Sequence, residues 1–178
     1  IIDEASHLTG MVNDLLDISK LQAGVTQLNK THFNLTKNLQ AAVQRIGRMA
    51  SANEFTIELM CDHDEEVFVD ADEFKIYQVV YNLINNALNY SGDSRHVIVR
   101  QECIGDTVKV SVQDFGPGIA KENLPLVWER YYKVDKEHRR SFNGSGLGLA
   151  IVRKILELHN AQYGVDSTLG QGSTFWFC

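Results

Sequence analysis

The stretch Asp114-Phe115-Gly116-Pro117-Gly118-Ile119 follows a run of alternating apolar and polar residues, 107–112, that is typical of a β-strand. An aspartate at the end of a strand is placed to accept a hydrogen bond from an amine such as that of adenine. A charge-assisted bond of this kind contributes roughly 1.5 to 3 kcal/mol. Gly116 and Gly118 carry no Cβ, so the backbone there can approach a flat ligand closely. The stretch therefore predicts either a nucleotide-binding loop or an ordinary turn that contains aspartate.

A second glycine-rich stretch, Gly144-Ser145-Gly146-Leu147-Gly148-Leu149, opens a predicted helix over residues 147–159. A glycine-rich loop that leads into a helix offers free N–H groups and the positive end of the helix dipole to phosphate groups. The stretch does not match the dinucleotide fingerprint G-x-G-x-x-G, because Leu149 stands where the last glycine belongs. The chain contains no Gly-Lys pair, so it has no P-loop. We expect phosphate binding of another type, with a simple turn as the alternative.

Four asparagines, Asn82, Asn85, Asn86 and Asn89, lie within one predicted helix. Asparagine is a mediocre helix former because its side chain competes for backbone hydrogen bonds. Asn82, Asn86 and Asn89 are spaced four and three residues apart, so they share one helix face, and the opposite face is apolar. An amide oxygen is a neutral, hard ligand that suits Mg²⁺ already carrying phosphate oxygens and water. The pattern predicts a magnesium-linked site or a solvated polar face.

The other periodicities predict an α/β fold with helices packed on one face of a mixed, mostly antiparallel sheet, that is, a two-layer sandwich. Strands are expected near 27–33, 55–60, 67–69, 96–102 and 107–112, with two more around Gly170 and Gly172. Helices are expected from an Asn34 cap to about Ser51, from Asp70 or Asp72 to about Leu88, over 124–132 and over 147–159. Residues 133–148 show no periodicity, and a stretch that long without structure tends to be functional.

Residues 1–23 are expected to form one long N-terminal helix that Gly24 stops. Apolar residues recur there at alternating spacings of four and three, which is typical of a seam for a partner helix. The alternative is an amphipathic helix that packs on its own domain. From the apolar repeat at the first residues and the strand-like pattern at the last, we expect the chain to be a fragment of a longer protein.

Composition narrows the function classes. The chain has 178 residues, 44% of them hydrophobic, and a net charge of −6. Ordinary hydrophobicity predicts a globular domain with a sizeable core. The negative charge disfavours a nucleic-acid partner and a membrane-surface role, and no apolar run approaches the roughly 18 residues of a membrane span. The three cysteines are far apart and lack metal-ligand spacing, so we expect reduced, structural thiols.

Five motifs in order resemble the catalytic ATP-binding domain of sensor histidine kinases, which belongs to a larger group with DNA gyrase, Hsp90 and MutL. The motifs are Asn82…Asn86, Asp114-x-Gly116-x-Gly118, Trp128-Glu129-Arg130-Tyr131-Tyr132, Gly144-x-Gly146-x-Gly148 and Gly170-x-Gly172. Each motif is modest alone, but their order and spacing are specific. The resemblance covers about residues 25–178, whereas residues 3–24 are similar to the second helix of that family's dimerisation hairpin. We therefore divide the chain into 1–24 and 25–178.

The resemblance implies a Bergerat-type fold that binds ATP and Mg²⁺ between two helices, under a lid formed by residues 133–142. It implies that Asn86 holds Mg²⁺, that Tyr90 stacks near adenine and that Asp114 binds the adenine amine. It makes Asn82 and Arg130 the catalytic candidates, Arg130 as a partner of the γ-phosphate. The implied ATP-binding set is Asn82, Asn86, Asn89, Tyr90, Asp114, Gly116, Gly118, Ile119, Lys133, Gly144, Ser145, Gly146, Leu147, Gly148 and Leu149.

The chain departs from the family pattern at several positions. Asn89 stands where the family often has Lys or Arg, and Phe115 replaces a small or polar residue. The acceptor histidine of the family sits before an acidic residue on a preceding helix, and none of the six histidines here has that setting. The gyrase and Hsp90 branch has a general-base Glu where Asn82 stands. Because an amide cannot take a proton from water, the sequence favours phosphoryl transfer to a protein side chain over hydrolysis.

The leading hypothesis is thus a histidine kinase catalytic domain that passes the γ-phosphoryl of ATP to a His upstream of residue 1. The resemblance implies a response-regulator receiver domain as partner, a homodimer through the N-terminal hairpin, and no nucleic acid. It also implies a cytoplasmic domain of a bacterial membrane-bound sensor. The alternative, from another class, is a non-catalytic ATP-binding module that acts through dimerisation.

Overall fold

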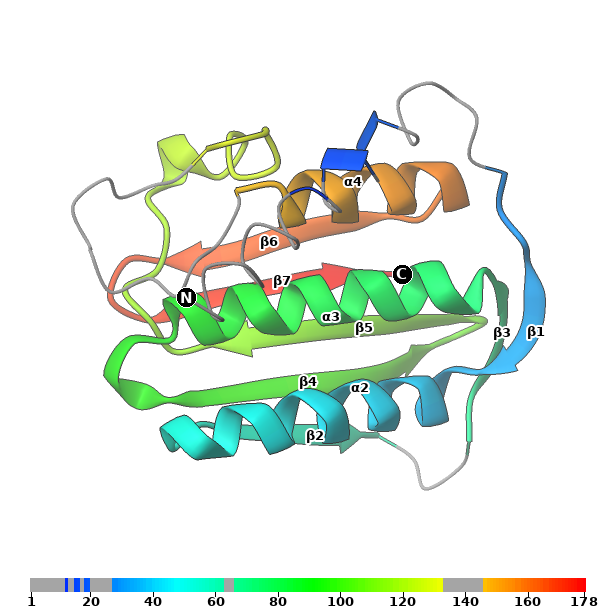
Figure 1. Ribbon diagram of the computed structural model, residues 1–178, viewed down its shortest axis with the longest axis horizontal. Helices are drawn as coiled ribbons and strands as arrows, with labels where there is room; N and C mark the ends of the chain where they lie inside the picture. The colour runs from blue at the N-terminus through cyan, green and yellow to red at the C-terminus, as the bar shows by residue number, and fades with distance from the viewer. Residues whose placement is uncertain (1–11, 13–14, 17, 20–26, 63–65, 133–145) are drawn as a thin grey trace.

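Five strands form the main sheet of this computed structural model, which describes residues 12, 15–16, 18–19, 27–62, 66–132 and 146–178 (Figure 1). The strand order is β2-β4-β5-β7-β6. The strands are β2 (Thr56–Cys61), β4 (His96–Ile104), β5 (Thr107–Asp114), β6 (Tyr163–Thr168) and β7 (Gly172–Phe177). Only the β2–β4 pair is parallel, and the other three pairs are antiparallel. The predicted mixed, mostly antiparallel sheet is confirmed.

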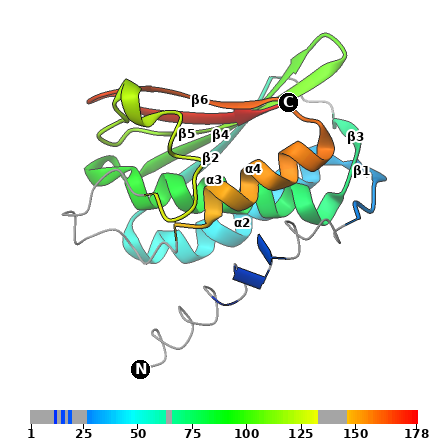
Figure 2. The same cartoon turned by 90° about the horizontal axis from the view of Figure 1, so that it is seen from above.

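Three helices cover one face of this sheet, as Figure 2 shows from above. They are α2 (Leu35–Ala50), α3 (Glu73–Tyr90) and α4 (Gly148–His159). Alternate residues of the central strands, such as Val99, Val112 and Phe175, are buried in the core cluster. The apolar sides of the helices meet them, with Leu83 and Ile155 fully buried. The two-layer arrangement with all the helices on one face is confirmed for the described residues.

Side chains cap the first two helices. The Asn34 amide oxygen accepts from the N–H of Lys37 at 2.9 Å, and the Asp72 carboxylate accepts from the N–H of Lys75 at 3.1 Å. Each cap satisfies a donor that the first helical turn leaves open. Both starts were predicted, and Asp72 rather than Asp70 is the cap of α3. In contrast, the N-cap residue of α4, Leu147, makes no side-chain hydrogen bond to its first turn.

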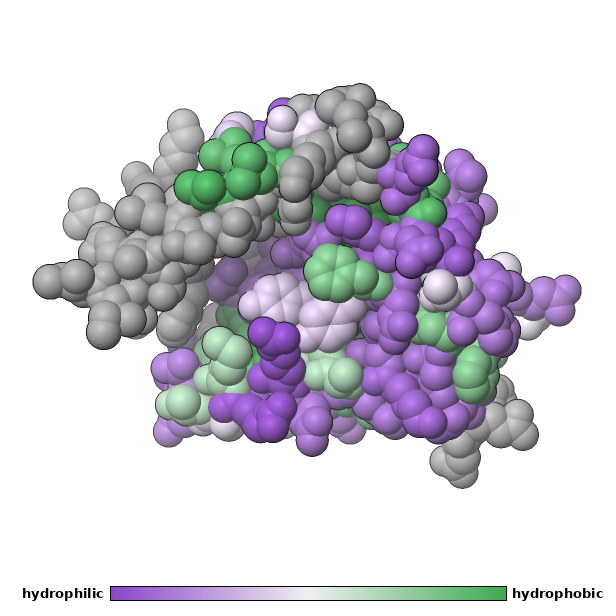
Figure 3. All heavy atoms as spheres, turned by 45° about the vertical axis from the view of Figure 1, so that its right-hand side comes forward, coloured by the Kyte–Doolittle hydropathy of each residue, from purple (hydrophilic) through white to green (hydrophobic). Residues whose placement is uncertain are grey.

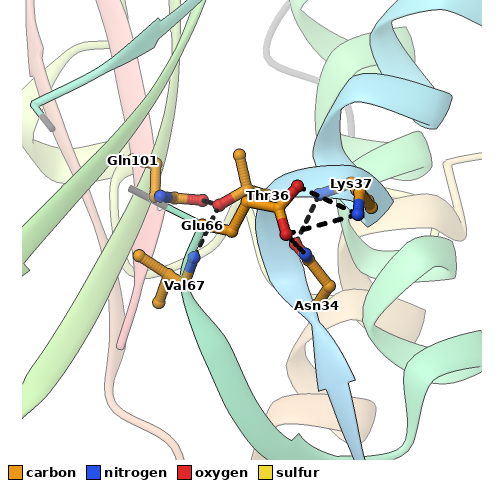
Figure 4. Close-up of polar contacts among 6 residues, drawn as sticks. All are labelled: Asn34, Thr36, Lys37, Glu66, Val67 and Gln101. Atoms are coloured by element: carbon orange, nitrogen blue, oxygen red, sulfur yellow. Dashed lines mark hydrogen bonds and ion pairs between the residues drawn. The ribbon is translucent and has the colours of Figure 1, made fainter. Parts of the chain in front are cut away.

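A small second sheet lies at the right-hand end of the sandwich in Figure 1, away from the end of β5. β1 (Thr31–Asn34) pairs antiparallel with β3 (Phe68–Ala71). Next to it, Thr36 links three elements: its hydroxyl donates to Gln101 of β4 at 3.0 Å and accepts from the N–H of Val67 at 3.0 Å (Figure 4). Hydrogen bonding by Lys37 lowers the pKa of the neighbouring exposed Glu66 carboxyl. This network fixes α2 against the sheet.

The structure corrects the sequence prediction in two segments. Residues 124–132 do not form a helix; a short 3-10 turn, Lys121–Asn123, leads instead into successive turns. The N–H of Tyr131 donates to Gly146 at 2.9 Å, so it is not available to a helix, and Tyr131 has a left-handed φ of 58°. The first strand is also shorter than predicted, because the N–H of Asn29 binds the Asp72 carboxylate instead of a strand partner.

The described N-terminal residues, Val12, Leu15, Leu16, Ile18 and Ser19, are helical. Ile18 is 5% exposed and belongs to the core cluster, so the helix packs on its own domain there. The three other apolar residues are 47–54% exposed, which leaves an apolar side for another partner. The rest of the predicted helix and the boundary at residue 24 lie outside the described residues.

On the face that Figure 3 shows, the surface is mostly hydrophilic, with apolar residues in small separate areas.

Candidate functional site

Two of the predicted glycine motifs lie along the C-terminal half of α3, where Gly116 is next to Tyr90 and Gly148 is next to Asn82. β5 ends at Asp114, α3 ends at Tyr90, and α4 begins at Gly148. In Figure 1 the ends of β5 and α3 and the turn between β6 and β7 lie at the left-hand side, and α4 begins nearer the middle of the view. The antiparallel packing of α3 on α4 places the C-terminal half of α3 beside the first turn of α4. Residues that are far apart in the sequence therefore surround one region.

Asp114 is the buried acid of this region, with 2% of its surface exposed. Its Oδ1 accepts from the N–H of Gly116 at 2.9 Å, and the backbone of Ser173 also hydrogen-bonds the carboxylate. Burial raises the pKa of the Asp114 carboxyl, and the Gly116 and Ser173 bonds offset this in part. A buried carboxylate held by two backbone donors has a fixed direction, which suits recognition of a single amine.

Glycines are required around Asp114 because other backbones pass very close. A Cβ on Gly116 would lie 1.7 Å from the carbonyl oxygen of Tyr90, the last residue of α3. A Cβ on Gly172 would lie 2.1 Å from the carbonyl oxygen of Asp114. Gly172 also has a left-handed φ of 90°, which favours glycine. At Gly172, the motif Gly170-x-Gly172 therefore lets the start of β7 pack against the backbone of Asp114.

Asn82, on the asparagine face of α3, lies next to the start of α4. A Cβ built on Gly148 would make ordinary contact, at 3.6 Å, with Oδ1 of Asn82. Asn82, Asn86 and Asn89 are half-buried, and their amides form no hydrogen bond within the described residues. The first turn of α4 also lacks a side-chain cap. The Asn82 amide oxygen and the start of α4 therefore lie side by side.

The segment that contains Arg130 is tied to the second glycine stretch. The N–H of Tyr131 donates to Gly146, whose φ is 71° and whose added Cβ would lie 3.1 Å from Cα of Tyr131. Arg130 is exposed. Glu129 beside it pairs with Arg153 of α4 at 2.8 Å. The positions of Lys133, Gly144 and Ser145, and the predicted lid over 133–142, lie outside the described residues.

Three residues of the predicted ATP-binding set have side chains that pack into or against the core, so only their backbone could contact a ligand. The side chain of Leu147 is buried, and those of Leu149 and Ile119 pack against the core. Tyr90 is 37% exposed at the end of α3, whereas Phe115 stacks on His96 with ring centroids 5.5 Å apart.

Two residues of this region were missed in the sequence. The backbone of Ser173 supports Asp114, and the hydroxyl of Ser167 binds the N–H of Ile119 at 2.8 Å. Both serines look like ordinary strand residues, and only the pairing of β5, β6 and β7 brings them to the site. No local sequence signal marks them.

Within the described ranges, no group of three or more His, Cys, Asp or Glu side chains is arranged to hold a metal ion. A cation here would depend on an amide such as Asn86 and on oxygens of the ligand itself. Among the described helices, none is long and apolar enough to cross a bilayer.

Comparison with known proteins places this geometry in a family. Residues 71–178, which include Asp114, the asparagine face and the described glycines of the site, match the histidine kinase-, DNA gyrase B-, and HSP90-like ATPases. The chain belongs to this ATPase family. This chain is similar over 98% of its own length to the circadian input-output histidine kinase CikA of Synechococcus elongatus, with 33% identity. It is equally similar, at 33% identity over 98% of its length, to the sensor histidine kinase WalK of Bacillus subtilis.

Solved structures agree with this placement of the ATPase-family domain. Full-length ShkA in complex with AMPPNP superposes with a TM-score of 0.83 at 28% identity, over 96% of this chain and 35% of that one. The nucleotide-free catalytic domain of the histidine kinase ThkA gives 0.72 at 26% identity, over 84% of this chain and 93% of that one. The chain spans 23% and 29% of the lengths of CikA and WalK. The resemblance to the histidine kinases that the motifs indicated is confirmed.

Proposed function

We propose that this domain binds ATP and transfers its γ-phosphoryl group to a histidine on a separate helix, as the catalytic part of a sensor histidine kinase. Two contacts along α3 carry the proposal: Gly116, which follows Asp114, lies next to Tyr90 at the end of α3, and Gly148 lies next to Asn82 of the same helix. Similarity to named histidine kinases over nearly the whole chain supports it.

Each part of ATP has a matching group. The buried Asp114 carboxylate would accept from the adenine amine. Gly116 and Gly118 let the loop after Asp114 pack against the backbone of Tyr90 and Thr168, which would hold that loop beside the base. The uncapped N–H groups at the start of α4 suit the phosphates, because a helix N-terminus attracts negative charge. Arg130, which is exposed next to this segment, would stabilise the charge that develops on the γ-phosphoryl.

Magnesium fits this site as an ion shared with the nucleotide. Asn86 supplies a neutral hard oxygen, and the described chain offers no acidic cluster that would bind the ion alone. When bound, Mg²⁺ would neutralise charge on the phosphate oxygens. Asn86 would hold the ion, and Asn82 would lie beside it on the same helix face.

The amide at Asn82 favours transfer over hydrolysis. Water attack on the phosphoryl group needs a base to take a proton, and Asn82, next to Gly148, cannot act as one. A histidine side chain needs no such help, because a neutral imidazole nitrogen is already a nucleophile. The absence of a base at this position therefore protects ATP until an acceptor histidine arrives.

We further propose the partners that this activity requires. The exposed side chains of Val12, Leu15 and Leu16 would form the seam of a homodimer. A response-regulator receiver domain would accept the phosphoryl group from the histidine, and the whole protein would be a membrane-bound sensor. The second candidate, a non-catalytic ATP-binding module, is favoured by one observation only: Asn89 offers no positive charge to the phosphates.

Phosphotransfer can be tested by mixing the domain with labelled Mg-ATP and a purified helical hairpin that bears an acceptor histidine. Label should appear on the hairpin with the wild-type domain and not with Asn86→Ala, which should also lose Mg-dependent ATP binding by calorimetry. The exposed Asn53, in the short turn after α2, provides the matched control Asn53→Ala, which should behave as the wild type. Nucleotide binding without label transfer would support the module, and unchanged affinity in Asn86→Ala would exclude the metal assignment.

A further inference from the structure

The loop that follows Asp114 is braced from one side by the β6–β7 hairpin. The N–H of Gly170 donates to the carbonyl of Pro117 at 2.7 Å. A Cβ on Gly118 would lie 2.1 Å from the carbonyl oxygen of Thr168. The hairpin and the loop thus touch along several residues, and the contact is backbone to backbone.

Ser167 stands at the centre of this contact. Its hydroxyl oxygen accepts from the N–H of Ile119 at 2.8 Å, donates to the carbonyl of Gly172 at 2.8 Å and lies 3.0 Å from the hydroxyl of Ser173. A serine hydroxyl has one proton and two acceptor lone pairs. Since its proton goes to Gly172, Ser167 accepts from both Ile119 and Ser173. All of its hydrogen-bonding capacity is used.

The partners of Ser167 lie on two segments that flank Asp114: the loop that follows it and the strand β7 that pairs with it. Ile119 closes the loop that begins at Asp114, and Ser173 pairs with Asp114 across β5 and β7. The Ser167 hydroxyl therefore links the end of the loop to the strand that supports the carboxylate. Without it, the N–H of Ile119 and the carbonyl of Gly172 would have to find water, and among the described hydrogen bonds between hairpin and loop the one from Gly170 to Pro117 would remain.

We propose that Ser167 is a positioning residue for base recognition, an inference that rests on the proposed binding of ATP. Through the N–H of Ile119 it fixes the loop 115–119 against β6 and β7, and thereby the direction in which Asp114 faces the 6-amino group of a purine. Ser167 touches no nucleotide itself. Its effect is on which base is bound rather than on phosphate binding.

The test compares two nucleotides by calorimetry with the whole domain. One is ATP, and the other is purine riboside triphosphate, which lacks the 6-amino group. Ser167→Ala should weaken ATP binding roughly 5- to 20-fold, the effect of losing one well-placed hydrogen bond, and should change binding of the analogue much less. The preference for ATP should shrink accordingly. A purely structural role would weaken both nucleotides alike and leave the preference unchanged.

Two variants serve as controls. Ser167→Thr keeps the hydroxyl and should restore the preference for ATP. Thr107→Ala removes another hydroxyl that donates to a backbone carbonyl, that of Ile104 at 2.9 Å, but at the far end of β5 from Asp114. It should leave both affinities unchanged. Hydrogen exchange at the amide of Ile119 should be faster in Ser167→Ala than in the wild type.

The outcomes separate this inference from the function on which it rests. A wild-type domain that binds no ATP would overturn the proposed function. A wild-type domain that prefers ATP, together with a Ser167→Ala variant of equal preference, would overturn only the role of Ser167. If Ser167→Ala does not fold, Ser167→Cys replaces it, because a thiol keeps the volume and hydrogen-bonds weakly. An unchanged preference in that variant counts equally against the inference.

Discussion

Among single residues, the buried Asp114 carboxylate should make the stability of the fold depend on pH, because burial disfavours its charged form. Burial raises the pKa of its carboxyl in the folded state above the ordinary value of about 4. Between those two pKa values the folded state binds more protons than the unfolded state. The free energy of unfolding therefore falls as pH rises through that window.

Asp114→Asn removes this titration and keeps an acceptor for the N–H of Gly116. We expect its stability relative to the wild type to increase as pH rises through the window and to level off above it. Urea unfolding of both proteins at a series of pH values measures this difference. A difference that stays constant with pH would contradict the raised pKa.

Gly116 and Gly47 make a matched pair of glycines. A Cβ at Gly116 meets the Tyr90 carbonyl at 1.7 Å, so Gly116→Ala should displace the end of α3, lower stability and weaken ATP binding at least about tenfold. Gly47 lies inside α2 with nothing within 4 Å of an added Cβ. Gly47→Ala should instead stabilise the domain by up to about 1 kcal/mol and leave binding unchanged. Urea unfolding and calorimetry on both variants provide the comparison.

Among elements, the contact between α2 and β4 depends on the buried hydroxyl of Thr36 (Figure 4). Thr36→Val keeps the shape of the side chain but leaves the N–H of Val67 and the oxygen of Gln101 without their partner. We expect a loss of about 1 to 3 kcal/mol in the free energy of unfolding, which urea titration measures.

The exposed Thr107 provides the control for that substitution, since Thr107→Val should change stability by no more than about 0.5 kcal/mol. ATP affinity should remain that of the wild type in both variants, because this network lies at the end of the sandwich away from Asp114. A Thr36→Val variant as stable as the wild type would show that water replaces the hydroxyl.

Helix starts could be predicted from the sequence because their caps are local. Asn34 and Asp72 each bind an N–H only three residues ahead. The segment 124–132 could not be predicted in this way. Its turns depend on the bond from Tyr131 to Gly146, fifteen residues further on, which no local periodicity records. Tertiary contacts of this kind override local propensity.

Across the whole molecule, most of the sheet and its helical layer follow from residue periodicity, and the order of the motifs indicated the site. Gly148 lies next to Asn82, and Gly116 lies next to Tyr90 at the end of the same helix. The roles of Ser167 and Ser173 depend on cross-strand register, which a single sequence does not encode in any short pattern. The assigned functions of the site residues remain predictions for the experiments above.

The edge-on packing of Trp128 on Tyr163 and Phe175, with centroids 5.0 and 5.6 Å away, gives the molecule an optical signal of its own. Trp128 lies on the segment between Ile119 and Tyr131, whereas Trp176 lies on the opposite face of the sheet beneath Lys109. The two indoles therefore sample different surroundings. With Trp176 replaced by Phe, the tryptophan emission of the domain reports on Trp128 alone, and therefore on the packing of its segment against β6 and β7.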